Sequence, residues 1–141
     1  MIDLENKTSC KPDIPFLEKI TQSLTSKDVE LIITTNDEIA TINKEFRNKE
    51  QPTDVLSFPL EEMEEIPLLG SIVISFDFVQ QKADELGHTY MDELSLLYIH
   101  GLLHLLGYDH EVDNGQMREE EKRLIQQWNL PQSLIVRTQG V

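Results

Sequence analysis

The chain has 141 residues, with 12 Lys and Arg against 26 Asp and Glu, which leaves a formal net charge of −14. This length is typical of a single domain, and it supplies enough apolar residues to form a core. The negative charge argues against a general nucleic-acid coat protein, which needs a broad basic face to neutralise phosphates. The single cysteine, Cys10, excludes an intramolecular disulfide and with it a disulfide-stapled secreted domain.

The sequence also lacks the features of a membrane or exported protein. Its most apolar stretch, residues 94–106, is shorter than the roughly 20 residues that cross a bilayer. The N-terminal residues do not show the basic and then apolar regions of a signal peptide. We therefore expect a soluble, cytoplasmic protein with one domain over residues 1–141, of which 130–141 form a flexible tail.

The first part of the chain predicts strands that alternate with helices. A weakly alternating N-terminal segment is typical of an edge strand, an apolar repeat at helical spacing predicts a helix, and a short β-branched run predicts a buried strand. These three elements span residues 1–7, 14–24 and 29–34. Thr35 followed by Glu38 forms a capping-box pattern, which opens a second helix that carries apolar residues as far as Phe46.

Two further strands are predicted in the middle of the chain. A polar loop over 47–53 leads into an alternating strand over 54–58, which Pro59 ends. The acidic run at 61–65 predicts a solvent-exposed loop, because a cluster of like charges is best accommodated in water. The apolar run at 70–75 predicts the most strongly marked strand in the chain.

Three helices follow this strand. The first two span residues 77–86 and 89–106 and end at Gly87 and Gly107, since glycine readily adopts the left-handed conformation that closes a helix. The third opens at Asp113, with Gln116 as its capping partner. Strands alternate with helices in the first part of the chain, and only helices follow in the last part. This order predicts an α+β fold with a mixed sheet covered by helices.

Three of the four histidines fall within one short stretch of the second of these helices and the turn after it. His100 and His104 are one helical turn apart, so both imidazoles can face one ion. Gly107 ends the helix, and the following turn can bring His110 back to the same point. A lone histidine here would be an ordinary core or surface residue, but three unpartnered rings among leucines would be costly to bury. Three imidazoles with one open position predict a catalytic zinc site at the C-terminal end of a helix.

The spacing of these histidines matches that of H-E-x-x-H-x-x-G-x-x-H metallopeptidases. Those enzymes carry a glutamate after the first ligand as general base, and this chain has Gly101 there. Cleavage of a phosphodiester instead calls for positive charge beside the phosphate. Arg47, Lys44 and Lys49 form the densest basic cluster in the chain, although an arginine at a helix end can also simply offset the helix dipole.

The stretch from His100 to His110 resembles the signature of the YbeY family, bacterial rRNA maturation factors that are metal-dependent endoribonucleases. Residues 46–59, which end in Pro-Thr-Asp-Val-Leu-Ser-Phe-Pro, are similar to a second hallmark of that family, and residues 87–94 to a third. The three segments keep the order and spacing of the family over nearly half of the chain. One departure is Ser71, where the family commonly has aspartate.

The resemblance implies an α+β fold with a small mixed sheet of about four strands and about five helices. It implies that His100, His104 and His110 bind one metal ion, usually Zn²⁺, and that Arg47 is the family's essential arginine. It also implies cleavage of single-stranded RNA in 3′-end maturation of 16S rRNA and in ribosome quality control. The implied partners are the small ribosomal subunit, a small-subunit ribosomal protein and a ribosome-associated GTPase, without a membrane.

From these residues we expect Arg47 and His100 to carry catalysis, with Arg47 clamping the phosphate. Lys44, Lys49 and Ser57 are expected to contact the substrate. The negative charge predicts weak activity on free RNA and assistance from the basic surface of a ribosomal protein.

Other roles and functions stay open. His88 is left outside the ligand set, and Asp109 and Glu111 are candidates to orient an imidazole through its other nitrogen. One alternative function is a non-catalytic ribosome assembly factor that zinc stabilises, and another is a zinc peptidase or other hydrolase.

Overall fold

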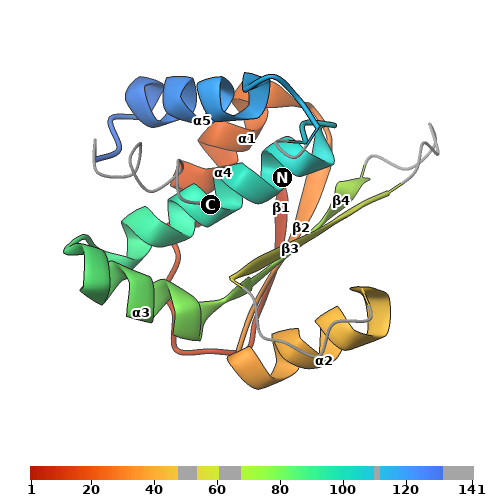
Figure 1. The fold of residues 1–141 in the computed structure, drawn as a ribbon, viewed down its shortest axis with the longest axis vertical. Helices are drawn as coiled ribbons and strands as arrows, with labels where there is room; N and C mark the ends of the chain where they lie inside the picture. Colours follow the sequence, from red (N-terminus) through yellow and green to blue (C-terminus); the bar gives the residue numbers. More distant parts are fainter. Residues whose placement is uncertain (48–53, 61–67, 110–111, 132–141) are drawn as a thin grey trace.

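The computed structural model describes residues 1–47, 54–60, 68–109 and 112–131 (Figure 1). Within these ranges the chain forms four strands and five helices. In chain order they are β1 (Ile2–Asn6), α1 (Ile14–Leu24), β2 (Asp28–Thr34), α2 (Asn36–Arg47), β3 (Val55–Pro59), β4 (Leu68–Ser75), α3 (Phe76–Leu86), α4 (Tyr90–Leu105) and α5 (Gln116–Gln127). The predicted α+β class is confirmed.

The strands form one sheet in the order β1-β2-β4-β3. The pairs β1–β2 and β2–β4 are parallel, whereas β3 runs antiparallel to β4 and forms one edge of the sheet. Parallel neighbours need long crossover connections, and α1 supplies the one between β1 and β2. The mixed sheet expected from the order of the elements is therefore present.

The two faces of the sheet are covered unequally. Helix α4 lies against β3 and β4 on one face and is contacted by α1, α3 and α5, whereas α2 lies on the other face (Figure 1). Every residue of α4 from Glu93 to Leu103 is buried, which explains why this helix is apolar on all sides. The histidine-bearing helix is thus the central helix of the fold.

Local signals place the ends of α3 and α4 as predicted. Gly87 closes α3 at a φ of 74°. The Thr89 hydroxyl accepts a hydrogen bond from the Asp92 backbone nitrogen at 3.1 Å, and the Asp92 carboxylate accepts one from the Thr89 nitrogen at 3.4 Å. This reciprocal capping box fixes the first turn of α4.

The predicted start of the last helix is wrong. Helix α5 begins at Gln116 rather than at Asp113, and Gly115 occupies its N-cap position. The Asp113 carboxylate accepts hydrogen bonds from the backbone nitrogens of Gly115 and Met117, and the Gln116 side chain accepts one from the Asn114 nitrogen. The two polar side chains therefore stabilise the turn before the helix instead of forming a capping pair.

Two predicted segments lie mostly or entirely outside the described residues. The predicted acidic loop at 61–65 and residues 132–141 of the predicted tail lie outside the described residues. Leu130, at the start of that tail, is 9% exposed and packs against the core. In the described part of the chain, no helix is long and apolar enough to cross a membrane.

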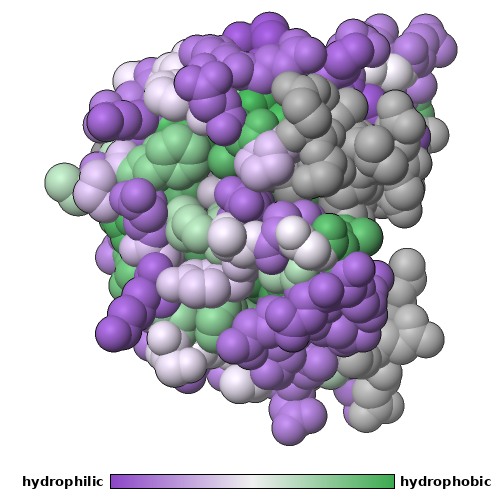
Figure 2. All heavy atoms as spheres, turned by 90° about the vertical axis from the view of Figure 1, so that its left-hand side faces the viewer, coloured by the Kyte–Doolittle hydropathy of each residue, from purple (hydrophilic) through white to green (hydrophobic). Residues whose placement is uncertain are grey.

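The described surface is largely hydrophilic. Figure 2 shows hydrophilic residues at both ends of one face, with smaller apolar areas between them. This distribution agrees with a formal net charge of −14.

Candidate metal centre

His100 and His104 lie one turn apart toward the C-terminal end of α4. Their Nε2 atoms are 3.2 Å apart, and the two rings meet edge to face with centroids separated by 4.7 Å. The predicted convergence of these two imidazoles is confirmed. It follows from the i, i+4 spacing on a regular helix, which stacks the two side chains along one face.

The separation of these nitrogens fits a shared zinc ion. Zn–N bonds of about 2.0–2.1 Å at tetrahedral angles place two ligand nitrogens about 3.3–3.4 Å apart, close to the spacing found here. Imidazole nitrogen is also a donor that zinc prefers. His110 lies outside the described residues, and within those residues no group of three potential ligands comes together. The structure thus describes two of the three predicted ligands.

A carboxylate from α5 holds the first of these histidines. His100 Nδ1 and Glu121 Oε1 are 2.7 Å apart, and Glu121 is only 2% exposed. Asp109 and Glu111 are the residues predicted for such a role, and Glu121 is not among them; Glu111 lies outside the described residues. One signal could have found it: Glu121 occupies a position of the buried stripe of α5, where an apolar side chain is expected.

Gly101 faces the sheet rather than the two histidine nitrogens. A Cβ at this position would lie 2.9 Å from Ile72 Cγ2 of β4, closer than real Cβ atoms approach a neighbour. The absence of a side chain therefore lets α4 lie directly on the sheet. A glutamate here would be directed into the core, which argues against the metallopeptidase alternative.

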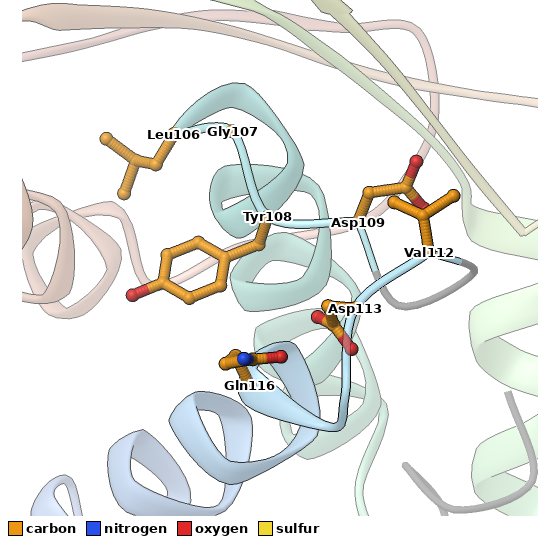
Figure 3. Close-up of a pocket in the computed structure, with 7 residues that line it drawn as sticks. All are labelled: Leu106, Gly107, Tyr108, Asp109, Val112, Asp113 and Gln116. Carbon is orange, nitrogen blue, oxygen red and sulfur yellow. The ribbon is translucent and has the colours of Figure 1, made fainter.

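The turn after α4 lines an open depression. It has a volume of about 500 Å³ and is formed by residues between the end of α4 and the start of α5 (Figure 3). Tyr108 and Asp109 lie on this turn, and their side chains point in different directions. Neither His100 nor His104 is among the residues that line this depression.

Ser57 lies on the face of the sheet that α4 covers. Strand alternation directs its neighbours Leu56 and Phe58 to the opposite face, where they pack in the small cluster near α2. Ser57 is half-buried and pairs with Ile72, the residue that Gly101 approaches. The contact of Ser57 with substrate stays a prediction.

The predicted basic residues belong to α2 and the segment after it. Lys44 is exposed on α2, Arg47 is the last residue of that helix, and the Arg47 side chain and Lys49 lie outside the described part of the structure. The rings of Phe46 and Phe58 pack edge to face with centroids 5.5 Å apart. This contact fixes the C-terminal turn of α2 on β3, the strand that carries Ser57.

Ser71, which stands where the family commonly has aspartate, lies on the face of the sheet opposite to the histidines. Ser71 pairs with Phe58 and shares its face, and its hydroxyl donates a hydrogen bond to Glu30 Oε1 at 2.7 Å. A carboxylate from β2 therefore reaches the position at which the family commonly carries aspartate. The substitution does not remove a group from the histidine side of the sheet.

His88 belongs to a separate buried pair at the other end of α4. Its Nε2 lies 3.1 Å from Glu93 Oε2, and the two side chains are 4% and 0% exposed. Because His88 precedes the first turn of α4, it lies away from His100 and His104 near the end of that helix. Its exclusion from the predicted ligand set agrees with this position.

Within the described residues, a mixed sheet of four strands and five helices defines an α+β protein. The solution structure of TM1509 from Thermotoga maritima has this fold, with a TM-score of 0.61 and 31% identity over 94% of this chain and 95% of that one. The family model described as "Endoribonuclease YbeY" matches residues 8–129. The chain therefore belongs to the endoribonuclease YbeY family, which confirms the resemblance.

Two relatives show how far this similarity extends. A protein of Aliarcobacter butzleri named Endoribonuclease YbeY is 59% identical over 138 residues, covering 97% of this chain and 99% of the relative. A protein of the same name from Sulfurimonas denitrificans is 59% identical over 140 residues, covering 99% of this chain and 100% of the relative. The similarity thus includes every segment discussed above.

Proposed function

We propose that this protein is a zinc-dependent endoribonuclease that cleaves single-stranded RNA during 3′-end maturation of 16S rRNA and in ribosome quality control. Membership of the endoribonuclease YbeY family supports the activity. The observation that carries the metal dependence is the 3.2 Å separation of the His100 and His104 Nε2 atoms. His110 completes the proposed ligand set.

The residues of the site have different proposed roles in phosphodiester cleavage. Zinc held by these three imidazoles would act as a Lewis acid and would lower the pKa of bound water to about 7. Arg47 binds the scissile phosphate through its planar guanidinium and stabilises the negative charge that develops there. Lys44 and Lys49 attract the RNA backbone, and the Ser57 hydroxyl makes a hydrogen bond to it.

The charge of the protein explains why it would act on the ribosome. At a formal net charge of −14, most of the surface repels free RNA, so binding depends on the few cations near the site. An acidic surface suits docking to a basic small-subunit ribosomal protein. We therefore propose a cytoplasmic enzyme that acts on the small ribosomal subunit, with a small-subunit ribosomal protein and a ribosome-associated GTPase as partners. It should cleave naked RNA only weakly.

An Arg47→Ala variant tests the catalytic proposal. We expect it to fold and bind zinc like the wild type but to cleave a single-stranded RNA with the 16S 3′-end sequence about 10²–10³-fold more slowly. Arg118→Ala removes an exposed arginine from α5 and serves as the matched control. Full processing by Arg47→Ala would favour the alternative, a non-catalytic assembly factor that zinc stabilises.

A further inference from the structure

Glu121 is an acidic residue in the apolar stripe of α5. Its neighbours on that stripe, Met117, Leu124 and Ile125, are fully buried, and Glu121 itself is 2% exposed. A buried carboxylate loses its hydration and destabilises the fold unless a partner compensates it. Packing alone would be served as well or better by an apolar side chain of similar size.

The partner of this carboxylate is the imidazole of His100. Glu121 Oε1 lies 2.7 Å from His100 Nδ1, the length of a charge-assisted hydrogen bond. An ionised carboxylate can only accept, so the Nδ1 atom carries the hydrogen. In a neutral imidazole the lone pair then resides on Nε2, the nitrogen that lies 3.2 Å from His104 Nε2.

We propose that Glu121 is a positioning residue for the metal centre. Its carboxylate holds His100 in the Nδ1–H tautomer, with the Nε2 lone pair directed toward His104. This inference rests on the proposed zinc site. Glu121 does not touch the metal or the RNA in this arrangement. It acts through His100, by fixing the ring orientation and making Nε2 a better donor.

Zinc affinity tests the inference without any measurement of cleavage. Glu121→Leu removes the acceptor, and we expect it to bind zinc about 10–100-fold more weakly in competition with a chromogenic chelator. Glu121→Gln keeps an oxygen that can accept from Nδ1, so its affinity stays within about tenfold of the wild type. Glu119→Leu changes an exposed carboxylate of the same helix and should leave the affinity unchanged. Wild-type affinity in a folded Glu121→Leu variant would overturn the proposal.

The tautomer of His100 provides a second test, which holds even if Glu121→Leu does not fold. Nitrogen-15 NMR of the metal-free wild type should show His100 protonated at Nδ1 and unprotonated at Nε2. The opposite tautomer would refute the inference. A wild-type protein that binds no zinc but shows the Nδ1–H tautomer would refute the proposed zinc site and leave the hydrogen bond standing, so the two failures can be told apart.

Discussion

Two buried imidazole–carboxylate pairs lie toward opposite ends of α4, and they differ at the second nitrogen of the ring. His88 Nε2 is 3.1 Å from Glu93, and His88 Nδ1 is buried without a hydrogen-bond partner among the described residues. His100 Nδ1 is 2.7 Å from Glu121, and His100 Nε2 faces the Nε2 atom of a second histidine. The same two functional groups are thus set in different surroundings.

The difference shows that a buried histidine–glutamate contact does not by itself indicate a metal site. The His88 pair connects the turn before α4 to the first turn of that helix, so it stabilises the junction of α3 and α4. The His100 pair joins α4 to α5 and directs the other ring nitrogen of His100 toward another potential ligand, His104. The two pairs differ in what lies beside the ring nitrogen that does not contact the carboxylate. Variants of the His88–Glu93 pair and of the proposed His100–Glu121 pair should therefore behave differently.

The largest effect is expected from breaking the structural pair. His88→Leu leaves the fully buried Glu93 without this partner, and we expect a loss of about 3–5 kcal/mol in the free energy of unfolding. Urea denaturation of the metal-free protein measures this loss. Zinc binding by the folded fraction should be unaffected.

A double variant separates the pair from simple loss of packing. Replacing both His88 and Glu93 by leucine removes the buried carboxylate along with the imidazole. We expect the combined loss to be about 1–3 kcal/mol smaller than the sum of the two single losses. Strict additivity would show that the two side chains do not stabilise each other.

The next largest effect is expected at His104, beside the His100–Glu121 pair, and concerns zinc rather than the metal-free fold. At a free zinc concentration of about 100 times the dissociation constant, the wild type should gain about 2.7 kcal/mol in the free energy of unfolding. His104→Ala should lose this gain while keeping the metal-free stability nearly unchanged, because its side chain is only partly buried. Denaturation with and without zinc, with metal content by mass spectrometry, gives both values. A zinc gain retained by His104→Ala would remove the distinction between the pairs.

Sequence patterns were sufficient for two features of α4 that depend on neighbouring residues. The i, i+4 spacing of His100 and His104 determines that their rings meet on one helix face. Thr89 and Asp92, three residues apart, determine where α4 begins. Both features are confirmed because helix geometry alone fixes them.

Features that depend on packing between distant segments could not be predicted in this way. Glu121 is 21 residues from His100 in sequence, and the two meet only because α5 packs against α4. The strand order β1-β2-β4-β3 likewise depends on how the crossovers fold.

At Asp113, the capping pattern correctly predicted that the side chain forms hydrogen bonds with nearby backbone nitrogens, but it gave the wrong start for helix α5. The Asp113 carboxylate stabilises the turn that precedes this helix.

A smaller effect is expected from Gly101→Ala, which disturbs the α4 turn of His100 and leaves the His88 pair untouched. The new methyl group would lie 2.9 Å from Ile72 Cγ2, so α4 must move away from β4. We expect a net loss of no more than about 2 kcal/mol, because overpacking costs about 1–3 kcal/mol and alanine regains about 1 kcal/mol in helix propensity.

The Ile72→Ala background identifies the cause of that loss. If contact with Ile72 is responsible, Gly101→Ala should cost little or nothing once the isoleucine side chain is shortened. Thermal or urea denaturation of the four proteins in this cycle gives the comparison. An equal loss in both backgrounds would mean that Gly101 matters for another reason than its approach to the sheet.

The smallest effect is expected from an exposed pair, which gives a reference for the two buried ones. Hydrogen bonds from Lys7 and, to a smaller extent, from Thr34 lower the pKa of the Glu38 carboxyl below its usual range. A lowered folded-state pKa adds stability that is present above the unfolded pKa of about 4.3 and is lost as the pH falls through the folded value. Since solvent screens both charged groups, this contribution should be well below that of either buried pair.

Lys7→Gln should therefore lower the stability slightly above about pH 5 and flatten the acid side of the profile between about pH 3 and 5, so that its stability and that of the wild type converge at lower pH. The proton uptake of Glu38 would move toward that of the unfolded chain, so less stability would remain to be lost on acidification. Urea midpoints across this range measure the change, and Lys82→Gln, in an exposed pair with Glu85, gives a matched control of similar size. A steeper acid loss in Lys7→Gln would contradict the sign of the Glu38 shift, and an effect as large as that of His88→Leu would show that burial is not what separates these pairs.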